Sequence, residues 1–158
     1  MFGRRLARFT TEERGAVLIE ALIVFPLLTV MSFAFLEFGN MMWERQQMQA
    51  GVRDAARYWS RCRPATTTFA STCDEATARN IAFYGNPAGT GSPRVPGWTT
   101  AAQITITPSK ATLPSYPVAT DLVRVSGTTT YIGSPAFGAF MTSGVTISAS
   151  TEMRSIGW

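Results

Sequence analysis

The sequence predicts an α+β protein in which a long N-terminal helix packs on a small antiparallel β-sheet domain. Three observations predict it: an apolar run over residues 16–36, an amphipathic helical pattern directly after that run, and three alternating segments near the C-terminus. The chain has 158 residues, enough for one modest domain besides the apolar run. We therefore expect the long helix to have a transmembrane half and an amphipathic half.

The apolar run contains a single ionisable residue, Glu20. As a helix, residues 16–36 would span about 30 Å, which is the thickness of the hydrocarbon core of a bilayer. We expect Pro26 to kink this helix, because proline lacks the N–H that would form a backbone hydrogen bond. The run predicts one membrane-spanning helix.

The residues that flank the run predict its orientation. Residues 1–15 contain four arginines, whereas the 20 residues that follow Leu36 contain only Arg45 and Arg53. Basic residues near a membrane segment favour the cytoplasmic side. We expect a single-pass protein of the inner membrane, with its N-terminus in the cytoplasm and its C-terminal domain periplasmic or extracellular. We expect a basic leader at residues 1–15 and a transmembrane helix at residues 16–36. An amphipathic extension of the helix follows at residues 37–63, and a β-rich domain at residues 64–158.

After the run, apolar residues continue on one face of a helix. They recur at alternating spacings of three and four, with a gap only at Arg45; the stripe is Phe38, Met41, Met48, Val52, Ala55 and Trp59. We predict one helix from near residue 16 to near residue 61. We favour burial of the stripe under the chain's own sheet, and the alternative is a surface for a partner helix. Arg53, Asp54 and Arg57 are expected to form a solvated cluster of charges.

Beyond the helix, the pattern changes to short elements. Residues 74–84 predict a helix closed by Gly85, and residues 86–100 read as a loop. Gly127 suggests a bulge in a strand. Apolar and polar residues alternate in three strand candidates, as expected for a sheet with one solvated face; these are residues 103–107, 121–132 and 145–154.

Two cysteines have ten residues between them, one at the end of the helix and one in the segment after it. Cys62 and Cys73 would lie in an oxidising compartment, where a disulfide is favoured over free thiols. Closing a loop of this size stabilises the fold by about 3 kcal/mol in the chain-entropy model. The alternative is two buried thiols.

The composition argues against an enzyme and against nucleic acid. The chain has no histidine, and two cysteines cannot complete a four-ligand zinc site. Residues 85–97 are rich in glycine but lack the Lys-Ser/Thr ending of a phosphate loop. The leader supplies +2 of the net charge of +4, so the remainder of the chain is only weakly basic. We expect no catalytic residues, no cofactor, no metal and no nucleic-acid partner.

The N-terminal segment resembles the class III signal of type IV pilins and pseudopilins. A basic leader ends in Gly15, and Glu20 follows as the fifth residue after it, in the sequence GAVLIE. Residues 14–62, from RGAVLIEALIVFPLL to RDAARYWSRC, are similar to the TadE-like minor pseudopilins of tight-adherence (Tad/Flp) pilus systems. The closing VTISASTEMR also resembles that family's last strand, whereas residues 63–100 carry almost none of the resemblance.

The resemblance implies a structural function, as a minor pseudopilin in the assembly of an adhesion pilus. A prepilin peptidase would cut between Gly15 and Ala16, so the leader would be removed and Glu20 would become mature residue five. In pilin-like proteins this carboxylate pairs with the N-terminal amine of a neighbouring subunit. The implied partners are the peptidase, other pilins and pseudopilins, and the inner-membrane assembly platform.

Several alternatives stay open at this point. A carboxylate inside a bilayer costs roughly 2.5 to 3.5 kcal/mol, which favours a functional role for Glu20. However, Glu20 is only about 6 Å along the helix from Ala16, so it can also lie hydrated near the interface. The chain can instead be an uncleaved signal anchor that carries a binding or adhesion domain. A secreted domain is disfavoured, because no small-x-small cleavage site follows Leu36. Residues 131–141 (YIGSPAFGAFM) fit either a core plug or an exposed contact patch.

Overall fold

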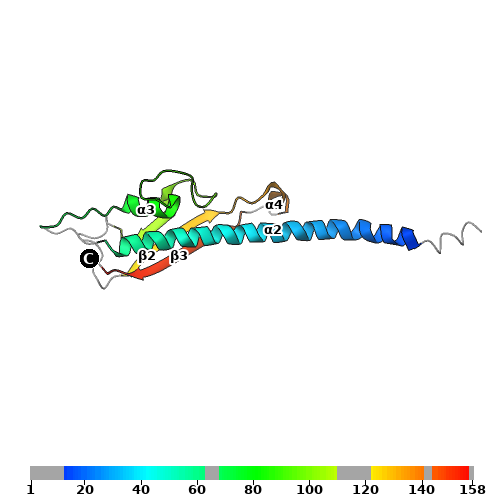
Figure 1. The fold of residues 1–158 in the computed structure, drawn as a ribbon, viewed down its shortest axis with the longest axis horizontal. Helices are drawn as coiled ribbons and strands as arrows, with labels where there is room; N and C mark the ends of the chain where they lie inside the picture. Colours follow the sequence, from blue (N-terminus) through cyan, green and yellow to red (C-terminus); the bar gives the residue numbers. More distant parts are fainter. Residues whose placement is uncertain (1–12, 63–67, 110–121, 141–143, 157–158) are drawn as a thin grey trace, which may run out of the picture. The chain divides into compact units, whose positions relative to one another are not determined.

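The computed structural model describes residues 13–62, 68–109, 122–140 and 144–156. Its elements follow the order α2, α3, η1, β1, β2, α4, β3 (Figure 1), and the fold has the α+β class that the sequence predicts. The chain divides into two compact units, which meet between Gly39 and Asn40. We call them the N-terminal unit and the C-terminal unit.

Helix α2 runs from Glu13 to Ser60 and crosses the boundary between the units. It begins three residues before Ala16, inside the predicted leader, and ends one residue before the predicted end. The helix continues through Pro26, and the expected kink there stays a prediction. Its apolar half is long and apolar enough to cross a membrane, and no part of its most apolar window is buried. One N-terminal apolar helix is therefore present, consistent with a membrane anchor.

A three-stranded antiparallel sheet forms the centre of the C-terminal unit. Strands β1 (Ile104–Thr107), β2 (Leu122–Thr130) and β3 (Thr146–Arg154) lie in the order β1-β2-β3, close to the three predicted segments. Buried and exposed side chains alternate along β1 and β2, because successive residues point to opposite faces. The sheet therefore has one dry face and one solvated face, as predicted.

The prediction of a bulge at Gly127 is wrong. β2 pairs with β3 in an unbroken register, with Ser126 opposite Ser150 and Gly127 opposite Ala149. A Cβ at Gly127 would lie 3.0 Å from Trp98 Cζ2 and 3.4 Å from Val52 Cγ1. The glycine is needed because these side chains pack closely against the strand, and not because the strand bends.

The stripe on α2 is buried by the chain itself over its second half. Met48, Val52, Ala55 and Trp59 are all 0% exposed and belong to the same core as the dry face of the sheet. Burial under the chain's own sheet is therefore confirmed for these four residues, whereas Phe38, the first residue of the stripe, is 59% exposed. At the gap in the stripe Arg45 is exposed, and the buried position is taken by the neighbouring Glu44.

Helix α3 (Glu75–Tyr84) packs against the buried side of α2. It ends at Gly85, whose φ of 81° is the left-handed conformation that glycine adopts readily, as the sequence predicted. A Cβ at Gly51 would lie 2.5 Å from the carbonyl oxygen of Ala82, so α2 and α3 approach each other closely. Phe83 of α3 stacks on Trp98, with ring centroids 5.7 Å apart.

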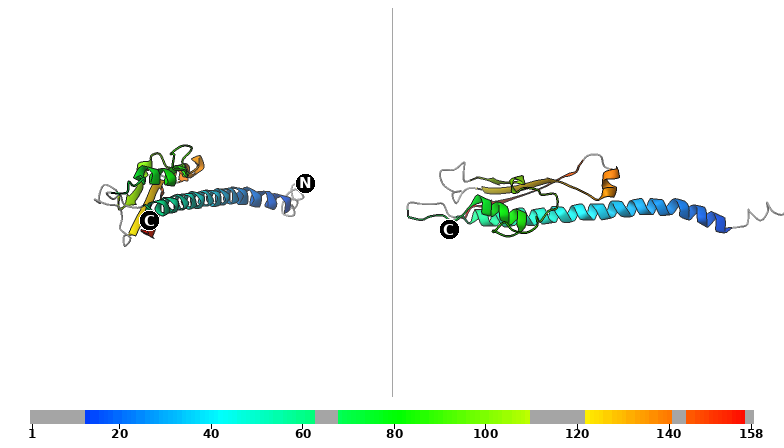
Figure 2. Two further views of the ribbon diagram at one scale, coloured as in Figure 1. Left: turned by 60° about the vertical axis from the view of Figure 1, so that its left-hand side comes forward. Right: turned by 90° about the horizontal axis from the view of Figure 1, so that it is seen from above.

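A short helix, α4 (Pro135–Phe140), follows β2 and lies at the opposite end of the C-terminal unit from α3 (Figures 1 and 2). It belongs to the apolar segment 131–141, which the sequence left open between core and contact patch. Tyr131 is buried, and Phe137 packs against its ring edge to face, at 5.4 Å between centroids. Ile132 is 65% exposed. The segment is therefore part core and part surface; Met141 lies outside the described residues.

Candidate anchoring and assembly site

Gly15, Ala16 and Glu20 lie in the first two turns of α2, and all three are exposed. No atom of the described residues lies within 4 Å of the place where a Cβ on Gly15 would be. Packing inside the part of the chain that the structure covers therefore does not require a glycine at this position.

Glu20 lies on an apolar face of the helix. It lines a shallow hollow of about 330 Å³ on that face, together with Val17, Ala21, Val24, Phe25 and Leu28. These residues are spaced three and four apart, so they share one side of α2. Glu20 makes no ion pair with any residue that the structure describes. The face thus offers one carboxylate, which can accept hydrogen bonds from a cation, surrounded by apolar side chains.

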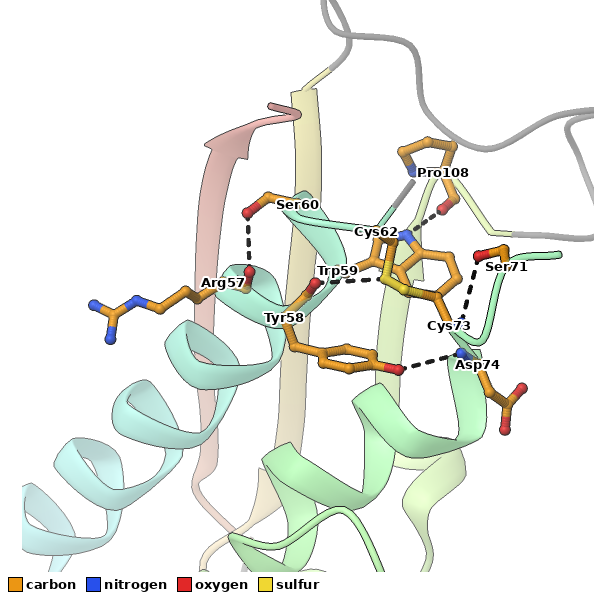
Figure 3. The surroundings of a disulfide bond; sticks show 9 residues. All are labelled: Arg57, Tyr58, Trp59, Ser60, Cys62, Ser71, Cys73, Asp74 and Pro108. Atoms are coloured by element: carbon orange, nitrogen blue, oxygen red, sulfur yellow. Dashed lines mark hydrogen bonds between the residues drawn. A yellow bond between two sulfur atoms is a disulfide. The ribbon is translucent and has the colours of Figure 1, made fainter. Parts of the chain in front are cut away.

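The predicted bond between Cys62 and Cys73 is present (Figure 3), with the two Cα atoms 5.8 Å apart. Cys62 follows the last turn of α2 and is buried, and Cys73 lies just before α3. The disulfide therefore joins the end of the long helix to the start of the next one, and the alternative of two buried thiols is wrong.

Hydrogen bonds reinforce this junction. The backbone N–H of Asp74 donates to the hydroxyl of Tyr58 at 3.3 Å, and Trp59 Nε1 donates to the carbonyl oxygen of Pro108 at 3.0 Å (Figure 3). The N–H of Ile156 donates to the carbonyl oxygen of Ser60 at 2.9 Å. The last turn of α2 is thus tied to the segments that adjoin α3, β1 and β3.

The structure assigns one member of the expected charge cluster differently. Arg53 and Arg57 are exposed, as predicted. Asp54 instead forms an ion pair with Arg94, at 3.0 Å between Oδ2 and Nη2. Arg94 lies in the loop over residues 86–100, and nothing in the local sequence around Asp54 signals this distant partner.

A second contact that the sequence did not reveal joins α2 to the segment after β2. Asn40 Nδ2 donates to the hydroxyl of Tyr131 at 2.9 Å. Both residues belong to the C-terminal unit, and Asn40 is its first residue.

Among residues 13–62, 68–109, 122–140 and 144–156, no three His, Cys, Asp or Glu side chains come together as a group that could hold a metal ion.

These features define a class: a protein with a pilin-like apolar helix near its N-terminus, continuous with a disulfide-closed α+β unit. Within that class, the model of the TadE-like protein family matches residues 15–57. Over these residues the chain is similar to TadE-like proteins, as its sequence pattern indicated. The match begins at Gly15, includes Glu20 and ends in the last turn of α2, so the disulfide and the sheet lie outside it. No curated protein and no solved structure matches the chain.

Proposed function

We propose that the protein is a minor pseudopilin that acts structurally in the assembly of a Tad/Flp-type adhesion pilus. The observation that carries the proposal is the TadE-like match over residues 15–57, since this family implies a role in a pilus system. TadE-like pilins are generally non-enzymatic. The proposed location is the inner membrane, with the N-terminus in the cytoplasm and the C-terminal unit on the far side.

Processing after Gly15 by a prepilin peptidase is the first part of the proposal. The family match begins at this glycine, and the surroundings of Gly15 in the structure give no packing reason for it. Recognition by an enzyme explains a small residue at an exposed position where a larger side chain would meet no obstacle. Cleavage there would give Ala16 a free α-amine.

Pairing of Glu20 with such an amine is the second part. A carboxylate within the hydrocarbon core costs roughly 2.5 to 3.5 kcal/mol, and a cation from a neighbouring subunit would compensate its charge. The apolar residues around Glu20 can contact the apolar helix of that neighbour at the same time. The carboxylate would thus favour the assembled state over the single subunit in lipid.

The processing step is tested by sequencing the N-terminus of the protein isolated from membranes, with and without the prepilin peptidase. We expect Ala16 as the first residue only when the peptidase is present. Gly15→Leu should leave the leader attached, whereas Gly39→Leu, also at an open position of α2, should be processed normally. If the intact leader remains in both samples, the proposal fails.

The assembly step is tested with Glu20→Ala in a strain that retains the peptidase. We expect normal processing but a marked loss of the protein from isolated pili or pilus complexes, because the neighbour's amine would lose its partner. Leu22→Ala, a truncation on another face of the same turn, should be recovered like the parent. Unchanged recovery of Glu20→Ala would defeat the pairing.

An uncleaved signal anchor with a binding or adhesion domain is the second candidate. It is favoured by one observation: the sheet, α3 and the disulfide all lie outside the residues that match the family. An intact leader in both sequencing samples would support it, and the function would then belong to the C-terminal unit.

A further inference from the structure

Charge is distributed unevenly along the sheet of the C-terminal unit. Arg124 stands opposite Glu152 at one end of the β2–β3 pair, and Leu122 stands opposite Arg154. No charged residue occurs in the sequence between Arg124 and Glu152. The other end of the pair, where Thr130 stands opposite Thr146, therefore carries no charge, and neither does α4 beyond it.

The uncharged end is joined to α2 next to the apolar run. The hydrogen bond between Asn40 Nδ2 and the Tyr131 hydroxyl places the start of the segment after β2 against Asn40. Asn40 is only four residues beyond Leu36, the last residue of the run. Four residues rise about 6 Å in a helix, and even a fully extended chain of that length spans only about 14 Å. This bound holds for any orientation of the two units.

The distance from Leu36 to Asn40 is comparable with the thickness of the headgroup layer, which adds roughly 5 to 8 Å to each side of the hydrocarbon core. Residues at this depth contact headgroups and the upper parts of lipid chains. Trp and Tyr are enriched there, because their rings are apolar and their N–H or O–H groups are polar.

The side chains at the uncharged end have the character that this layer favours. Ile132 is 65% exposed, directly after Tyr131. Trp43 is 50% exposed, three residues after Asn40 on α2. On β2 and β3 the charged side chains lie only at the other end of the pair, so contact with the upper parts of lipid chains is open to apolar side chains only at the uncharged end. On α2, Arg45 is exposed two residues after Trp43, where its charged group can reach the headgroups.

We propose that the end of the C-terminal unit formed by residues 131–140 and Trp43 lies in the headgroup layer of the leaflet from which α2 emerges, with Ile132 in contact with lipid. This inference rests on the membrane-spanning part of the proposed function and not on the pilus role. It assigns the exposed half of the apolar segment a partner, the bilayer surface. The contact would hold the C-terminal unit with this end of the sheet toward the membrane.

The test is a depth measurement on the full-length chain reconstituted in vesicles of phosphatidylethanolamine and phosphatidylglycerol. A single fluorophore is attached through Ile132→Cys, Leu122→Cys or Leu27→Cys, with the native disulfide left intact. Leu122 is the matched control, because it is an apolar side chain of β2 with 61% exposure at the charged end. Quenching is measured with a bromine-labelled lipid and, separately, with aqueous iodide.

We expect quenching by the brominated lipid to be several-fold stronger at position 132 than at position 122, with iodide showing the reverse order. Strong lipid quenching at position 27 reports insertion of α2 itself. If position 27 is in lipid while positions 132 and 122 are equally open to iodide, the inference is wrong and the membrane span stands. If position 27 is also open to iodide, both the lipid contact of Ile132 and the membrane-spanning role of α2 are wrong.

A protein neighbour is a further outcome. Shielding of position 132 from iodide in pilus complexes, but not in vesicles that contain the chain alone, would show that another subunit covers this end. That result would overturn the lipid contact.

Discussion

The two parts of helix α2 differ in what surrounds their apolar residues. In the part from Asn40 to Ser60, the stripe from Met48 to Trp59 is covered by the sheet and α3, so the chain itself explains why these residues are apolar. In the part before Asn40, apolar side chains are exposed all around the helix, and the chain offers no cover for them in its described residues. One continuous helix therefore has apolar residues for two different reasons. In its second part they pack against the protein itself, whereas in its first part the described residues leave them uncovered.

Two carboxylates of α2 show the same difference. Glu44 is only 3% exposed and is enclosed by the fold of its own C-terminal unit. Glu20 is exposed on an apolar helix that is expected to lie in lipid. Substitution of Glu44 tests folding, whereas substitution of Glu20 tests assembly.

Truncation of the tryptophans should give the largest contrast in stability between covered and uncovered residues. Trp59→Ala removes a fully buried indole and its hydrogen bond to Pro108, and we expect it to lower the free energy of unfolding by about 3 to 5 kcal/mol. Trp43→Ala should change it by less than about 0.5 kcal/mol, because Trp43 is half exposed. Urea unfolding of the full chain in detergent, followed by near-ultraviolet circular dichroism, measures both. Equal losses would break the comparison.

Removal of the disulfide should have the next largest effect. Cys62→Ala together with Cys73→Ala should lower the free energy of unfolding by about 3 kcal/mol. The bond joins two residues of the C-terminal unit that are 11 positions apart, so it closes a short loop. Membrane insertion of the N-terminal unit should not change, as judged by resistance to alkaline extraction. Reduction of the parent protein should reproduce the loss. A variant that keeps its stability but leaves the membrane would contradict the separation of the two parts.

A pair of glycine substitutions gives a smaller effect with opposite signs. Gly51→Ala would bring a methyl group within 2.5 Å of the carbonyl oxygen of Ala82, so α2 and α3 must move apart, at a cost of about 1 to 3 kcal/mol. Gly39→Ala meets open space and should stabilise the helix by up to about 1 kcal/mol. Thermal unfolding of the two variants in the same detergent measures the difference. The same sign for both would show that the close approach of the helices is not what requires Gly51.

The regular elements could be predicted because each has a local period. The α2 stripe, the alternation in the strands and Gly85 at the end of α3 are all visible within a few neighbouring residues. The predicted bulge at Gly127 was wrong because a glycine in a strand indicates either a bend or a close neighbour. The neighbour here, Trp98, is distant in sequence, so the local pattern could not decide between the two. The family pattern around Glu20 was also readable, because it is contiguous.

Contacts that join distant segments could not be predicted. The ion pair of Asp54 with Arg94 and the hydrogen bond of Asn40 with Tyr131 depend on how the loops fold over the helix. Sequence spacing carries no information about such pairs. The apolar stripe has a gap at Arg45, and its spacing did not predict that the neighbouring charged residue, Glu44, is buried.

The order of elements along the chain has a consequence for biogenesis. The stripe of α2 is synthesised early, but the strands that cover it, β2 and β3, follow only after α3 and β1. Contacts between segments so distant in sequence form slowly, and an uncovered apolar stripe is prone to aggregate in the meantime. In the proposed topology, a chain whose translocation halts before β3 would therefore expose Met48, Val52 and Trp59 at the membrane surface, where chaperones and proteases of the cell envelope would act on it.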